Sequence, residues 1–190
     1  MSIRIALDGG IMMHTKLKQQ LESEDPVHLY PGTNLRMFPG DILYSHKYAF
    51  SSFLVGHTAI VGENFRIYHV NRWQPFGHAD SMPIYLSRHK KREKLTVLRH
   101  DNEKEARNAA RWAMDNYDWV KRYVYYRDLR DIENNYCSKF VWQAFYFGND
   151  EKVNLLKAGH WKFLKRFVMP GSIYRRFKSI ARFENTLYPK

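Results

Sequence analysis

Cysteine is almost absent from this chain, which has one, Cys137, among 190 residues. A single thiol cannot form a disulfide within the chain, so its cysteine usage is compatible with a reducing compartment. The histidines form no HExxH motif and no close ligand pair, and Cys137 has no CxxC partner. The sequence therefore predicts neither a metal site nor a cofactor.

Long hydrophobic runs are also missing, because no segment approaches the ~18 consecutive apolar residues of a membrane span. The N-terminus lacks the basic start, continuous apolar stretch and cleavage site of a signal peptide, which predicts a cytoplasmic location. The chain contains no GxxxxGK[ST], GxGxxG or GxSxG motif. The sequence therefore gives no motif that would indicate a nucleotide-binding loop or a serine hydrolase.

Acidic residues are in deficit, since Lys and Arg total 31 against 19 for Asp and Glu, a formal charge of +12. This excess favours anionic partners, namely nucleic acid, anionic lipid or an acidic cell-wall polymer. Basic clusters occur at 88–94, 162–167 and 174–182, the last two interleaved with aromatic residues. The alternative is that these clusters are solvated faces whose long side chains cover apolar surface.

The residues that are present predict a folded domain, with 44% hydrophobic and 16% aromatic content. Two Pro-Gly pairs predict turns around a first strand, and Asp41 is interpreted as a turn or strand-end residue. Asp101 or Asn102 is expected to cap the helix over 103–119. Strands are predicted at 41–44, 57–61, 65–70 and 95–100, and helices at 15–24, 103–119 and 135–148.

Strands followed by helices indicate an α+β domain. Residues 1–37 are interpreted as an N-terminal extension with a short helix, and 38–190 as the main domain.

The helix at 135–148 carries Cys137 at its start. If Asn135 is the N-cap, Cys137 lies in the first turn, at the edge of the apolar face. Helix N-termini lower thiol pKa values, and the thiolate is the attacking species. The alternative is an inert thiol packed against the core.

A base for this thiol is predicted in a hairpin over 57–70. If Val61 pairs with Phe65, His57 falls directly opposite His69, with Cβ atoms about 5 Å apart. Such a pair suits a base and the residue that orients it. The alternative is two partly exposed strand histidines, and a register slip of one residue would separate them.

Four segments together resemble the NlpC-like cysteine peptidases, in their circularly permuted, papain-like branch called YiiX/YycO-like. They are PGDILY (39–44), GHTAIVGENFRIYHV (56–70), YCSKFVWQAF (136–145) and MPGSIYRRF (169–177). The resemblance implies a papain-like α+β fold, with a small antiparallel sheet or barrel packed on the cysteine helix. It also implies that Cys137 is the nucleophile, His57 its general base and His69 the orienting residue.

The activity that this resemblance implies is cleavage of an amide bond, in a peptide such as a peptidoglycan stem, through a thioester. The ring of Tyr136 would line the substrate cleft, or else simply pack. Acyl-lipid or thioester hydrolysis and acyl transfer are the alternative activities, because the branch is similar to lecithin–retinol acyltransferases. A third alternative is a non-enzymatic module that binds nucleic acid or membrane through Arg175, Arg176 and Lys178.

Overall fold

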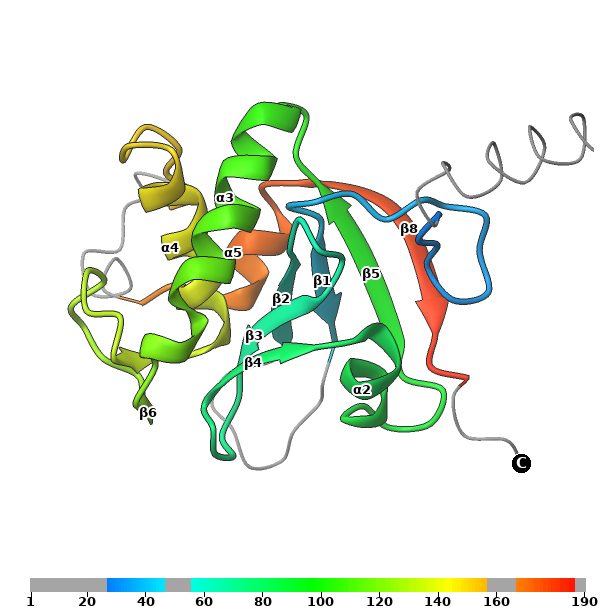
Figure 1. The fold of residues 1–190 in the computed structure, drawn as a ribbon, viewed down its shortest axis with the longest axis horizontal. Coiled ribbons are helices and arrows are strands. Elements are labelled where there is room, and N and C mark those ends of the chain that lie inside the picture. Colours follow the sequence, from blue (N-terminus) through cyan, green and yellow to red (C-terminus); the bar gives the residue numbers. More distant parts are fainter. Residues whose placement is uncertain (1–26, 47–55, 157–166, 187–190) are drawn as a thin grey trace, which may run out of the picture.

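One antiparallel sheet of six strands lies at the centre of the fold (Figure 1). The computed structural model describes residues 27–46, 56–156 and 167–186. The strand order across the sheet is β4-β3-β2-β1-β5-β8. The strands are β1 (Ile42–Ser45), β2 (His57–Val61), β3 (Ile67–Val70), β4 (Gly77–Asp80), β5 (Lys94–Arg99) and β8 (Lys178–Glu184).

Helices cover both faces of this sheet. The described helices are α2 (Met82–Ser87), α3 (Glu103–Asn116), α4 (Cys137–Gly148) and α5 (Pro170–Tyr174), with a 3-10 turn, η1 (Tyr117–Trp119), after α3. Two short strands, β6 (Arg122–Tyr123) and β7 (Asn134–Asn135), pair in parallel just before α4. In Figure 1, α3, α4 and α5 lie together on one side of the sheet, away from α2.

Strand alternation divides the core into two clusters. Ile42 of β1 and Ile60 of β2 face α3 and α4, whereas their neighbours Leu43 and Ala59 face α2. Successive side chains of a strand point to opposite faces, so every central strand contributes to both clusters. This explains why β1 and β2 are apolar almost throughout.

The predicted α+β class is confirmed, and several predicted elements agree with the structure. Strand β2 has the predicted bounds. Asn102 caps α3 by accepting a hydrogen bond from the Glu105 amide at 3.2 Å, but the helix ends at Asn116, where η1 begins. The helix predicted at 15–24 lies outside the described residues.

The predicted register of the hairpin is wrong by two residues. Val61 pairs with Ile67, not with Phe65, so His57 does not lie directly opposite His69. The turn is longer because Phe65 adopts a φ of 58° and the Arg66 amide donates to the Asn64 side chain. A shift of two residues keeps the same face, so both histidines still share one side of the sheet.

Asp41 connects the N-terminal loop to the sheet. Its carboxylate, 1% exposed, accepts hydrogen bonds from the Tyr30 hydroxyl at 2.7 Å and the Phe38 amide at 3.0 Å. The Arg99 guanidinium donates two more, both of 2.7 Å. Asp41 therefore serves as a strand-end anchor, in agreement with its interpretation from the sequence.

We expect Asp41→Ala to lower the free energy of unfolding by about 3–5 kcal/mol, because Arg99 and the Tyr30 hydroxyl lose a buried partner. Urea denaturation measures this change. The control is Glu103→Ala, which removes an exposed ion pair with Arg107 and should cost less than about 1 kcal/mol. Equal losses in the two variants would contradict the anchoring role of Asp41.

Candidate functional site

Cys137 is the first residue of α4, and Tyr136 is its N-cap. The prediction that Asn135 caps this helix is therefore wrong by one residue. Asn135 belongs to β7, and its side-chain amide donates to Gln143 Oε1 at 2.6 Å. Because Gln143 lies within α4, this bond ties the residues before the helix to the helix itself.

The thiol of Cys137 is 2% exposed, and burial raises its pKa. The amide and hydroxyl groups of Thr58 and Ser138 act in the opposite direction and lower the pKa. Burial outweighs them, so the predicted lowering of the thiol pKa is wrong for this structure. The resting group is a neutral thiol, which must lose its proton when it attacks.

The start of β2 meets the start of α4. Thr58, the second residue of β2, acts directly on the thiol of Cys137, as its effect on the thiol pKa indicates. His57, the residue before it, has its ring on the side of α2, with ring centroids 5.4 Å from His69 and 6.4 Å from Tyr85. Cys137 therefore lies beside the end of β2 at which His57 stands, but the thiol is on the α4 side of the sheet and the His57 ring is on the α2 side.

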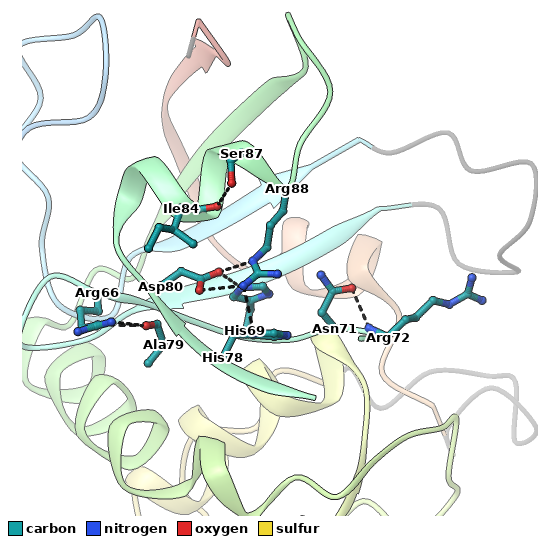
Figure 2. Close-up of polar contacts among 10 residues, drawn as sticks. All are labelled: Arg66, His69, Asn71, Arg72, His78, Ala79, Asp80, Ile84, Ser87 and Arg88. Carbon is teal, nitrogen blue, oxygen red and sulfur yellow. Dashed lines mark hydrogen bonds and ion pairs between the residues drawn. The ribbon is translucent and has the colours of Figure 1, made fainter. Parts of the chain in front are cut away.

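His69 is fully buried and bound to an acidic partner from the neighbouring strand (Figure 2). Its Nε2 lies 2.9 Å from Asp80 Oδ2, and the Arg88 guanidinium donates to Asp80 at 2.6 and 3.1 Å. Burial lowers the pKa of His69 to about 4, although Asp80 acts to raise it. The neutral ring therefore donates from Nε2, and Nδ1 has no hydrogen-bond partner within the described part of the chain.

Sequence reasoning missed Asp80, Arg88 and Tyr85. Strand β4 was not predicted, and β4 is the element that places Asp80 beside His69. Arg88 was read as part of a basic surface cluster, yet it points inward to Asp80. Tyr85 is fully buried, contacts the rings of both predicted histidines, and has a hydroxyl without a partner among the described residues.

Tyr136 lies in the core with no exposed surface. Its hydroxyl accepts a hydrogen bond of 2.8 Å from the Val168 amide, and its ring packs on Tyr125 with centroids 5.0 Å apart. The packing alternative accounts for all of these contacts. A contact of Tyr136 with substrate stays a prediction.

No cluster of three or more His, Cys, Asp or Glu side chains in the described ranges is arranged to bind a metal ion. Among the same residues, no helix is long and apolar enough to cross a bilayer.

Comparison with known proteins places the chain in a family. A family model described as lipoprotein N-acylation protein LnsA-like matches residues 13–161. The chain belongs to this LnsA-like family. The matched range includes Cys137, both candidate histidines and the Asp80–Arg88 pair.

A solved structure shows the same fold. It is the crystal structure of the metalloprotein YiiX from Escherichia coli O157:H7, with a TM-score of 0.56 and 14% sequence identity. The alignment covers 77% of this chain and 97% of that one. No curated protein matches the chain. The likeness confirms the YiiX-like part of the expected resemblance, while the peptidase activity and the papain-like relation stay predictions.

The buried neutral state of His69 predicts a dependence of stability on pH. Its pKa is about 4 in the folded protein and about 6.5 in an unfolded chain, so the unfolded state binds more protons between these values. Stability should be full above pH ~6.5 and should fall as the pH drops toward ~4. His69→Gln should flatten that fall, measured by urea denaturation at several pH values. An unchanged pH slope in the variant would show that His69 titrates normally.

Tyr136→Phe tests the packing role of the neighbouring tyrosine. The variant leaves the buried Val168 amide without a partner and should lose about 1–3 kcal/mol of unfolding free energy. The rate at which iodoacetamide modifies Cys137 in the folded protein should stay unchanged. Loss of substrate turnover at unchanged stability would instead support contact between Tyr136 and the substrate.

Proposed function

We propose that this protein is a cysteine acyltransferase, in which Cys137 accepts an acyl group from an acyl-lipid and transfers it to an amine. The observation that carries the proposal is the meeting of the thiol at the start of α4 with the start of β2, where His57 lies. The description of the matching family, lipoprotein N-acylation, supports acyl transfer over the cleavage of an amide bond.

In the first step, Cys137 Sγ attacks the ester carbonyl carbon as His57 takes the thiol proton. Because the His57 ring lies on the α2 side of the sheet, this step requires the ring to turn around the end of β2 toward the sulfur. This order suits a thiol whose pKa burial has raised, because general-base removal of the proton needs no preformed thiolate. The amide groups at the start of α4, which have no partner within the helix, would donate to the oxyanion. The C–O bond then breaks, the alcohol leaves with the proton from His57, and a thioester remains.

His69 would orient His57 and would itself be oriented by Asp80. The bond from His69 Nε2 to Asp80 fixes one tautomer, which leaves a lone pair on Nδ1 for an N–H of His57. Burial acts to raise the pKa of Asp80, but hydrogen bonds with His69 and Arg88 lower it and keep the carboxyl group ionised. A histidine that orients His57 must itself be held in place, and Asp80 supplies the hydrogen bond that holds the His69 ring.

In the second step, an amine attacks the thioester, His57 accepts a proton from it, and the thiol is restored as an amide forms. If water replaces the amine, the product is a free fatty acid, and the protein acts as an acyl-lipid hydrolase. Because Cys137 is 2% exposed, side chains near the sulfur must move to admit an acyl chain.

We expect incubation with a phospholipid in detergent micelles to add one acyl group to the protein, as seen by intact-mass spectrometry. Neutral hydroxylamine should remove the added mass, because it cleaves thioesters. Cys137→Ala should show no adduct, and His57→Ala should form it about 10²–10⁴ times more slowly.

A second variant separates chemistry from folding in this experiment. Arg107→Gln removes an exposed ion pair with Glu103 within α3, and it should form the adduct at the normal rate. An adduct on Cys137→Ala, or equal rates with and without His57, would refute the proposed roles. Addition of a peptide amine should then yield an N-acyl peptide, whereas release of free fatty acid alone would favour the hydrolase.

A further inference from the structure

Large apolar side chains are exposed on the loop between β3 and β4 and on the segment from η1 to Tyr126. Trp73 is 63% exposed, Trp119 57%, Tyr126 46% and Val124 39%. We call these four residues the exposed aromatic surface. A soluble protein normally buries most of its tryptophan, so a group of such side chains facing water marks an interaction site.

Half-buried and exposed side chains alternate along residues 123–126, and Val124 and Tyr126 are the exposed ones. Tyr123 and Tyr125 between them turn inward, with hydroxyl groups 3.3 Å apart, and Tyr125 packs on Tyr136. The alternate side chains of this segment, Val124 and Tyr126, face solvent.

Two chain segments meet at this surface. Arg72, the neighbour of Trp73, lies with its guanidinium carbon 6.0 Å from the centre of the Tyr123 ring. Gly77, at the other end of the same loop, packs so closely on η1 that a Cβ there would lie 1.7 Å from the Tyr117 carbonyl oxygen. Trp73 and Trp119 are therefore carried by loops that contact one another, not by separate parts of the molecule.

The surface is also basic. Residues 71–76 and 117–128 contain Arg72, Lys121, Arg122 and Arg127 against Asp118 and Asp128, a local excess of two positive charges. All four basic residues are exposed. Tryptophan and tyrosine next to lysine and arginine is the composition of protein surfaces that lie in the headgroup region of a bilayer.

We propose that the exposed aromatic surface docks the protein on an anionic lipid bilayer. The indole and phenol rings would enter the headgroup region, and the basic side chains would meet lipid phosphates. Tryptophan, tyrosine and arginine also suit a protein interface. The positive charge of this surface and of the whole chain, +12, favours an anionic bilayer as the occupant.

The docked orientation would bring lipid close to the thiol, and this consequence rests on the proposed function. The Val124 amide donates to the Asn135 carbonyl at 3.0 Å, two residues before Cys137. Burial raises the pKa of Tyr123 and Tyr125, and ionisation of Cys137 would raise both pKa values further, so Cys137 lies near both hydroxyl groups. The inward side of the segment thus faces the nucleophile while its outward side would face the bilayer.

Docking is tested with the full chain carrying Cys137→Ser, so that binding is measured without acyl transfer. The protein should co-sediment with vesicles of phosphatidylcholine and phosphatidylglycerol, and less with phosphatidylcholine alone. Binding should weaken as salt is raised, since screening shortens the reach of surface charge. The double variant Trp73→Ser/Trp119→Ser should bind at least about tenfold more weakly, because two large apolar contacts are lost.

The matched control is Leu29→Ser/Ile84→Ser, which removes two exposed apolar side chains elsewhere and should leave vesicle binding unchanged. If the tryptophan variant does not fold, as judged by circular dichroism, Val124→Asp provides a second test at an exposed position and should also weaken binding. Equal losses in control and test variants, or no vesicle binding by the parent protein, would overturn the proposal. The second result would leave the surface to a protein partner.

Discussion

The contact between the first turn of α4 and the first residues of β2 is the constraint on which the candidate site depends. Several buried polar bonds fix the start of the helix. Ser138 donates to the Val168 carbonyl at 2.7 Å, and Asn135 bonds to Gln143 at 2.6 Å. Leaving any of these buried groups without its hydrogen bond would cost free energy. The bonds on either side of Cys137 therefore hold its position.

The buried polar groups on the α2 side have a different significance. His69, His78 and Asp80 are all nearly inaccessible, and Arg88 is partly so. Replacing a buried cluster of charged and polar side chains by apolar residues of similar volume is often neutral or stabilising. A contribution to stability therefore does not by itself explain why this cluster is present. Clusters of perturbed titratable groups are typical of functional sites, and this cluster borders the ring of His57.

Local pattern was enough to predict part of this architecture. The alternation of HTAIV and the apolar face after Cys137 correctly indicated a strand and a helix, because each is decided by side-chain periodicity. The hairpin register was not predictable, since it depends on Phe65 adopting a positive φ. The raised pKa of Cys137 was missed for a similar reason, because the degree of burial is set by packing that no short stretch encodes.

Taken together, the two proposals favour acyl transfer at a bilayer over hydrolysis in water. The reason is that the start of α4 lies beside the strand that carries His57 on one side and beside an exposed apolar segment on the other. On one side, the start of the helix meets the strand that carries His57, next to His69 and Asp80. On the other side, β7 pairs with β6, and the segment that follows β6 presents Val124 and Tyr126. If Cys137 acts as the proposed nucleophile, its burial keeps the thiol from water until a substrate displaces the groups around it. An acyl chain entering from lipid meets that requirement, because burial of its apolar surface offsets the work of opening the site.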